Sequence, residues 1–148
     1  MIVRDETAMH QLGVRFGKSL KGGEVIELIG DVGAGKTTLV KGIADGLGIT
    51  DDVQSPSFTI NRNYQSPGGL TLCHYEFYRL NDAGIMSMEI AEAVSDPQNI
   101  TIIEWGASVH GALPSSRITI NINYLPDTGR DISISTPDGL DHLGDIIK

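Results

Sequence analysis

The chain has 148 residues, of which 40% are hydrophobic, and this size fits one compact domain spanning residues 1–148. The formal net charge of -8 argues against a surface that grips nucleic acid phosphates directly, because such binding depends on Lys and Arg. The single cysteine, Cys73, excludes an intrachain disulfide and a thiolate metal cluster. The acidic start of the chain does not fit a signal peptide, and no apolar run approaches the roughly 20 residues that span a bilayer, so we expect a cytoplasmic protein.

The first third of the chain predicts a helix, a buried strand and a second helix. Apolar residues recur at helical spacing after Asp5 or Thr7, either of which can cap a helix that ends at residues 21–23. Residues 24–29 are short, apolar and β-branched, as a buried strand should be. Residues 37–47 then read as a helix that Gly48 closes.

The remainder predicts two hairpins separated by a helix and a further strand. Strands over 58–64 and 70–77 flank turn chemistry, and strands over 117–124 and 130–135 flank a second turn. Between them, a helix capped by Asn81 or Asp82 precedes an apolar strand at 100–105. This mixture of parallel-type βα units and hairpins predicts an α/β sandwich with a mixed parallel and antiparallel sheet.

A phosphate-binding motif lies between the strand at 24–29 and the helix that follows it. The pattern G-x-x-x-x-G-K-[ST] matches from Gly30 to Thr37. In this motif glycines let backbone N–H groups cradle phosphate oxygens, Lys36 reaches the β and γ phosphates, and the Thr37 hydroxyl coordinates Mg²⁺. The strand before it and the helix after it favour a nucleoside triphosphate site over a merely flexible turn. The residues expected to bind there are Asp31, Val32, Gly33, Ala34, Gly35, Lys36, Thr37 and Thr38.

Hydrolysis also needs a carboxylate opposite this loop, to hold the water shell of the metal or to orient the attacking water. Glu104 closes an apolar strand, the Walker B arrangement, although a glutamate in that place is often only the solvated end of a strand. Glu76 is the second candidate, and the period of two places it on one strand face with His74 and Tyr78.

Other polar residues predict less. Ser57 and Thr59 occupy the region where many such enzymes place a γ-phosphate sensor, but a serine there is more often a turn residue. Cys73 and His74 are adjacent and so lie on opposite faces of a strand. With the other histidines scattered, we expect no zinc site.

Four stretches follow one another in the chain: GDVGAGKTT at 30–38, VQSPSFT at 53–59, HYEFYRL at 74–80 and IEW at 103–105. In order and spacing, these stretches together resemble the TsaE family of small bacterial ATPases in tRNA threonylcarbamoyladenosine biosynthesis. The match runs from about Glu6 to Arg130. Its glycine loop is shared by many proteins, whereas Ser-Pro-x-Phe-Thr combined with His-x-acid-x-Tyr-Arg is much more specific.

The resemblance implies a P-loop NTPase-type three-layer sandwich whose sheet includes antiparallel strands. It also implies slow hydrolysis of ATP with Mg²⁺, and association with TsaB–TsaD-type tRNA-modification proteins. The acidic net charge suggests that tRNA contacts this chain only indirectly.

The resemblance also assigns site residues. Lys36 and the loop amides would hold phosphates, and Thr37 and Glu104 would hold Mg²⁺. Glu76 would take the place of the family's acidic residue needed for hydrolysis. Four further positions match the family: Trp105 near the nucleotide, Thr7 near the adenine, and Arg79 and Arg130 in basic motifs that have either a binding or a structural role.

The chain departs from the family pattern at three positions. Glu76 replaces the usual aspartate, and its extra methylene makes the hydrolysis rate the property most affected. Ser57 stands where threonine is usual and keeps the hydroxyl, and Gly106 follows the tryptophan where proline is common.

Three alternatives remain beside the leading interpretation. A small-molecule kinase usually needs an Arg-rich lid, whereas this chain has only 11 Lys and Arg and no basic cluster after the third strand. A GTPase usually has an Asn-Lys-x-Asp run, which is absent from the sequence. The third alternative is an assembly factor that binds ATP without hydrolysing it. It differs from the ATPase of the leading interpretation only in the absence of turnover.

Overall fold

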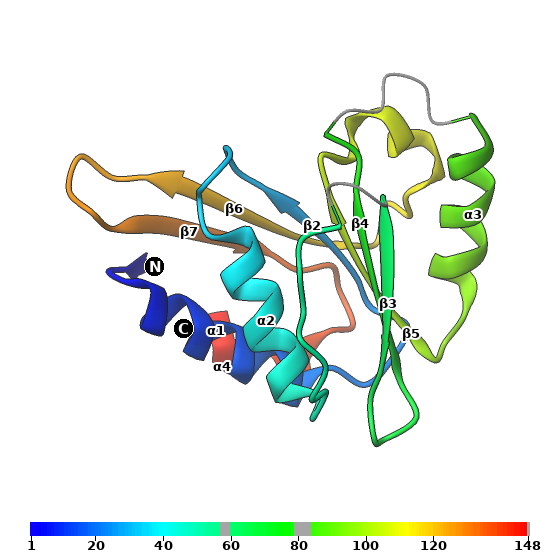
Figure 1. Ribbon diagram of the computed structural model, residues 1–148, viewed down its shortest axis with the longest axis horizontal. Coiled ribbons are helices and arrows are strands. Elements are labelled where there is room, and N and C mark those ends of the chain that lie inside the picture. Colours follow the sequence, from blue (N-terminus) through cyan, green and yellow to red (C-terminus); the bar gives the residue numbers. More distant parts are fainter. Residues whose placement is uncertain (57–59, 79–83, 148) are drawn as a thin grey trace.

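The fold is built on one seven-stranded mixed sheet, shown in Figure 1. The computed structural model describes residues 1–56, 60–78 and 84–147. The sheet order is β1-β7-β6-β2-β5-β4-β3; β6, β2, β5 and β4 run parallel, while β3, β7 and β1 pair antiparallel with their neighbours. The strands are β1 (Ile2–Val3), β2 (Val25–Ile29), β3 (Asn61–Gln65), β4 (Thr71–Glu76), β5 (Asn99–Glu104), β6 (Ile118–Tyr124) and β7 (Arg130–Ser135).

Helices cover both faces of this sheet, which makes three layers (Figure 1). Ile102 of β5 packs in a cluster with α1 and α2, whereas its neighbour Ile103 packs in a second cluster with α3, as the alternation of a strand requires. Among the described residues, no helix is long and apolar enough to cross a membrane. The helices are α1 (Glu6–Ser19), α2 (Lys36–Gly46), α3 (Gly84–Ser95) and α4 (Gly144–Ile147), with 3₁₀ segments η1 (Gly106–Ala112) and η2 (Asp141–Leu143).

The expected α/β class and mixed sheet are confirmed, with element bounds within a few residues of the prediction. Asp5 caps α1, because its Oδ1 accepts a hydrogen bond from the Ala8 amide at 2.7 Å, so the alternative cap Thr7 is wrong. Asn81 and Asp82, the predicted caps of α3, lie outside the described residues. The sequence did not predict β1 or the last two short helical segments, which are too short to show a period.

Helices α1 and α2 both have glycine residues where they cross, so their backbones are in direct contact. A Cβ added at Gly13 of α1 would lie 2.3 Å from the Leu39 carbonyl oxygen, and one at Gly42 of α2 would lie 2.2 Å from the His10 carbonyl oxygen. Gly17 and Gly46 make equally close approaches one turn further on. The two helices are therefore tightly packed, and α2 begins where the glycine motif ends.

The single cysteine lies in β4, and the reactivity of its thiol reports how tightly the sheet is packed. Cys73 is 3% exposed, and burial, helped by the negative charge of Asp96, raises its thiol pKa to about 11. Because the unfolded thiol ionises first, this group lowers the stability of the fold as pH rises from about 9 toward 11.

We expect the native protein to react with a thiol-specific reagent at pH 8 at least ~100-fold more slowly than the urea-unfolded chain, since the raised pKa lowers the thiolate fraction about that much. Absorbance during reaction with a chromogenic disulfide measures both rates. Equal rates in the two states would show that β4 opens readily.

Candidate functional site

The glycine loop (residues 30–37) connects the end of β2 to the start of α2. Gly33 and Gly35 adopt φ values of +78° and +109°, a left-handed conformation that side chains disfavour, and this lets the loop curl tightly. Gly35 also stands at the N-cap of α2 and makes no side-chain hydrogen bond there. Gly35 has no side chain that could accept hydrogen bonds from the first N–H groups of α2. Uncapped N–H groups at a helix N-terminus are suited to binding an anion.

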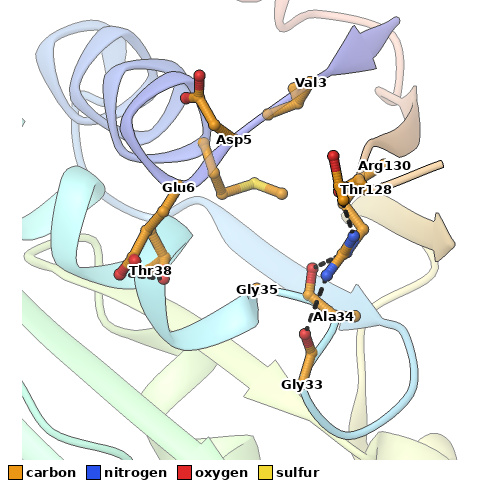
Figure 2. A pocket seen from close by; sticks show the side chains of 10 residues that line it. Val3, Asp5, Glu6, Gly33, Ala34, Gly35, Thr38, Thr128 and Arg130 are labelled. Atoms are coloured by element: carbon orange, nitrogen blue, oxygen red, sulfur yellow. Dashed lines mark hydrogen bonds between the residues drawn. The ribbon is translucent and has the colours of Figure 1, made fainter. Parts of the chain in front are cut away.

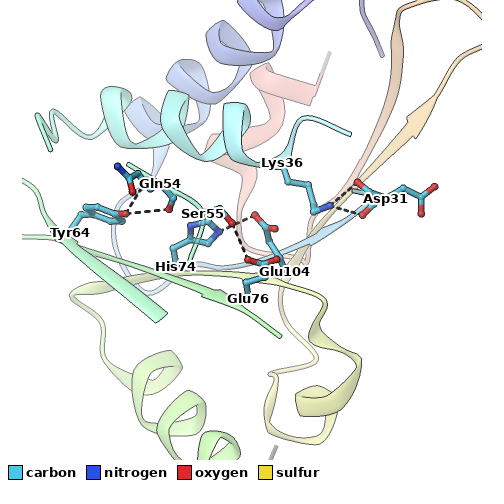
Figure 3. Close-up of polar contacts among 9 residues, drawn as sticks. Asp31, Lys36, Gln54, Ser55, Tyr64, His74, Glu76 and Glu104 are labelled. Carbon is cyan, nitrogen blue, oxygen red and sulfur yellow. Dashed lines mark hydrogen bonds and ion pairs between the residues drawn. The ribbon is translucent and has the colours of Figure 1, made fainter. Parts of the chain in front are cut away.

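Lys36 is folded back into the glycine loop (Figure 3). Its side chain is nearly buried, and its Nζ donates hydrogen bonds to the carbonyl oxygens of Gly30 at 2.7 Å and Asp31 at 2.9 Å. The same ammonium lies 4.9 Å from the centre of the Trp105 ring. An ammonium has three donors, so a phosphate oxygen can add a charge-assisted hydrogen bond here or replace a neutral carbonyl.

Two carboxylates stand side by side opposite the glycine loop. Strands β4 and β5 are parallel, and their register makes Glu76 and Glu104 direct neighbours at the carboxyl edge of the sheet. Ser55 Oγ donates to Glu76 Oε2 at 3.0 Å, and His74 Nε2 lies 3.0 Å from Glu104 Oε1 (Figure 3). These carboxylates and the loop face one cavity of about 300 Å³, lined by Val32, Gly33, Gly35, Lys36, Thr37, Thr38, Ser55, Glu76, Glu104 and Trp105.

The oxygen donors at this cavity are of the kind that a magnesium ion takes. Among the described residues, no group of three or more His, Cys, Asp or Glu side chains could hold a metal ion. Mg²⁺ needs less, because it usually takes one or two protein oxygens and completes its shell with phosphate oxygens and water. Thr37, Glu76 and Glu104 offer only oxygen donors at this cavity, the donor type that a hard cation prefers.

A second cavity of about 290 Å³ lies on the other side of the glycine loop, against α1 and β7 (Figure 2). Arg130 donates from Nε to the Ala34 carbonyl oxygen at 3.1 Å, and its guanidinium lies 4.2 Å from the centre of the Tyr124 ring. This side chain therefore ties β7 to the glycine loop. The cavity is lined by Val3, Asp5, Glu6, Met9, Gly33, Ala34, Gly35, Thr38, Thr128 and Arg130.

Thr7 was expected just before the first helix, which is wrong, and near the adenine, which stays a prediction. It stands within the first turn of α1 rather than before the helix, it is exposed, and it does not line the second cavity. Asp5 and Glu6 do line it, and Glu6 Oε1 accepts a hydrogen bond of 3.4 Å from Thr38 Oγ1. Sequence reasoning treated the acidic start of α1 only as a cap, so it missed these two carboxylates.

The end of β5 turns sharply into η1. Trp105 adopts a φ of +57°, unusual for a residue with a side chain, and its ring packs 4.9 Å from the Tyr78 ring as well as against Lys36. The structure thus brings Trp105 to the glycine loop, while its contact with nucleotide stays a prediction. Strain of this kind is often found at functional sites.

Three predicted positions are not among the described residues, and one serine that was not predicted contributes to the site. Ser57, Thr59 and Arg79 lie outside the described residues. Ser55, which sequence reasoning passed over as part of a loop, is the hydroxyl that bonds Glu76. The one feature of the sequence that could have indicated a role for Ser55 is its place two residues before the predicted sensor Ser57.

Comparison with known proteins places this fold and this glycine loop in one family of tRNA-modification factors. The family model "Threonylcarbamoyl adenosine biosynthesis protein TsaE" matches residues 3–132. The chain is similar to "tRNA threonylcarbamoyladenosine biosynthesis protein TsaE" of Streptomyces coelicolor, at 37% identity over 89% of this chain and 90% of the relative. It is also similar to the protein of that name from Bacillus subtilis, at 40% identity over 78% and 71%.

A solved structure agrees with the sequence comparison. The crystal structure of Bacillus subtilis YdiB superposes with a TM-score of 0.81 at 28% identity, covering 99% of this chain and 91% of that one. The chain therefore belongs to the TsaE family, as its motifs had indicated.

Proposed function

We propose that this protein binds ATP with Mg²⁺ and hydrolyses it slowly, in support of a TsaB–TsaD-type pair that modifies tRNA to threonylcarbamoyladenosine. The observation that carries the proposal is the convergence of Lys36 and Thr37 with Glu76 and Glu104 on one cavity. The names of the relatives support the pathway, and family membership favours it over a small-molecule kinase or a GTPase.

Each residue at the cavity has a chemical role in this proposal. The loop amides, the α2 N-terminus and Lys36 bind the β and γ phosphates. Thr37 and Glu104 hold Mg²⁺, which neutralises charge on the phosphates. Glu76, next to Glu104 in the sheet, orients the attacking water through its carboxylate.

Contact with tRNA falls to the partner proteins in this proposal. The formal net charge of -8 opposes binding to a phosphate backbone, which relies on clustered Lys and Arg. A direct tRNA-binding assay on the isolated chain checks this, and tight salt-sensitive binding would overturn it.

Substituting Glu76 separates binding from hydrolysis. We expect Glu76→Gln to lower phosphate release about 100-fold or more, since general-base catalysis contributes about that much, while ATP affinity changes by less than about threefold. Phosphate release, measured with and without the partner pair, and ATP titration report the two properties. Glu92→Gln on the exposed face of α3 is the matched control. Unchanged turnover in Glu76→Gln would remove this role from Glu76.

An assembly factor that binds ATP without turnover is the second candidate, and one contact favours it. Glu76 already bonds the Ser55 hydroxyl at 3.0 Å, which occupies one of its carboxylate oxygens. If Glu76→Asp, which restores the family's usual residue, raises phosphate release while wild type shows none above background, this second candidate is favoured. Assembly with the partner pair on a non-hydrolysable ATP analogue is then expected to match assembly on ATP.

A further inference from the structure

A buried histidine contacts the candidate metal ligand and has no role in the chemistry described so far. His74 is fully buried, and Glu104 is 3% exposed. His74 Nε2 lies 3.0 Å from Glu104 Oε1, although 30 residues separate them in the chain. The inference drawn from this pair rests on the proposed function, because that function is what assigns Glu104 to Mg²⁺.

The pairing of β4 and β5 creates this contact. In the register, His74 is the partner of Ile102, and Glu76 is the partner of Glu104. All four side chains project from the face of the sheet that α1 and α2 cover, because Ile102 belongs to the core cluster on that side. His74 is therefore a diagonal neighbour of Glu104 across the two strands, offset by two residues, and long side chains can span that separation.

The hydrogen bond sets the state of the histidine ring. A carboxylate oxygen accepts hydrogen bonds, and a hydrogen on Nε2 lets the ring donate to Glu104 Oε1. Nδ1 is buried and has no hydrogen-bond partner in the described part of the chain. A hydrogen on Nδ1 would be a buried donor left unpaired, which is costly, so this geometry points to a ring that carries its hydrogen on Nε2.

One oxygen of Glu104 is thus held and the other is left for the cavity. Oε1 accepts from His74, and no hydrogen bond to Oε2 is found within residues 1–56, 60–78 and 84–147. Glu104 lines the cavity that Lys36 and Thr37 also face. Glu76 stands directly beside it, and two like charges repel, so without a second contact the Glu104 carboxylate would be pushed out of place.

We propose that His74 is a positioning residue, which holds Glu104 through Oε1 and leaves Oε2 available to Mg²⁺ bound with the nucleotide. Hydrogen-bonded partners that orient a metal ligand commonly change metal affinity 10- to 100-fold when they are removed. His74 never touches nucleotide or metal in this arrangement. The effect of His74 is therefore specific to the metal and leaves the phosphate contacts of the glycine loop unchanged.

Paired substitutions at His74 test the proposal in the full-length protein. His74→Gln keeps an N–H donor at a reach comparable to Nε2, whereas His74→Phe fills the space without a donor. Paramagnetic resonance of free Mn²⁺ gives the Mn²⁺ affinity of the protein–ATP complex, and ATP titration in a chelator gives metal-free affinity. Thr101→Val is the matched control, because Thr101 is buried in β5 and its hydroxyl has no partner among the described residues.

We expect His74→Phe to weaken Mn²⁺ binding 10- to 100-fold with metal-free ATP affinity unchanged, and His74→Gln to recover to within about threefold of wild type. Thr101→Val is expected to match wild type. Unchanged Mn²⁺ affinity in His74→Phe overturns the proposal, and so does a loss that a folded His74→Gln fails to recover. Wild type that binds no ATP overturns the proposed function itself, and this result appears before any substitution is made.

A measurement on wild type keeps the proposal testable if His74→Phe does not fold. Nitrogen-15 NMR of the His74 ring is expected to show the Nε2–H tautomer, and its Nε2 signal is expected to shift when Mg²⁺ is added to the protein–nucleotide complex. An Nδ1–H tautomer, or a signal that Mg²⁺ leaves in place, overturns the proposal.

Discussion

Replacing Lys36 with alanine is expected to weaken ATP binding at least ~100-fold, which is the largest functional effect we foresee for a single substitution. The ammonium sits inside the glycine loop, where it bonds two carbonyl oxygens and faces the cavity with the α2 N-terminus. Hydrogen bonds to a charged group contribute about 1.5–3 kcal/mol each, and one or two of them to phosphate account for the loss.

The chain carries its own reporter for this experiment. Trp105 is the single tryptophan, and its ring centre lies 4.9 Å from Lys36 Nζ. Tryptophan fluorescence is therefore expected to change when phosphates draw the ammonium away, and a titration with ATP follows binding directly. A radioactive filter assay gives the affinity independently, because Lys36→Ala also changes the surroundings of the reporter.

Lys41→Ala controls for the loss of one positive charge, since Lys41 is an exposed residue of the same helix. We expect it to bind ATP within about twofold of wild type, because exposed charges interact weakly through water. Wild-type affinity in Lys36→Ala would refute the assignment of the glycine loop as the phosphate site.

Replacing Gly42 with alanine is expected to destabilise the fold by about 3 kcal/mol or to prevent folding. The added Cβ would lie 2.2 Å from the His10 carbonyl oxygen and 2.9 Å from Gly13 Cα, so α1 and α2 must separate to admit it. Overpacking of this kind costs about 1–3 kcal/mol, and here the obstruction is backbone that no side-chain rotation relieves.

The sign of this effect is diagnostic. Alanine normally stabilises a helix over glycine by about 0.5–1 kcal/mol, so a loss at Gly42 reports tertiary contact rather than helix propensity. Gly144→Ala in α4 is the matched control, because a Cβ there meets nothing within 4 Å. We expect that control to be neutral or stabilising in urea unfolding followed by circular dichroism. Equal behaviour of the two variants would show that α1 and α2 are not tightly packed.

Local patterns in the sequence were enough for the class of fold and the centre of the site. The strand, glycine loop and helix from residue 24 to residue 47 were predicted because each depends on neighbouring residues: β-branched apolar residues, glycines and helical spacing. The same reasoning placed Glu76 and Glu104 near the ends of strands. The family motifs then linked these local features in order, and the comparisons with known proteins confirm that link.

Long-range packing decided what local patterns could not. The sequence alone contains nothing that pairs Glu76 with Glu104 or His74 with Glu104, because a shift of one residue between β4 and β5 would turn one side chain of each pair to the other face. It placed Thr7 before the first helix, whereas Thr7 lies in the first turn of α1, and Glu6 of the same turn bonds Thr38 of α2.

The sequence by itself therefore determined the glycine loop with Lys36 and Thr37, since its conformation depends on glycines and on the helix that follows directly. Only the tertiary structure decided which carboxylates meet across from that loop and which histidine holds one of them. The physical reason is that strand register and helix docking minimise the energy of the whole core, to which residues far apart in the chain contribute together.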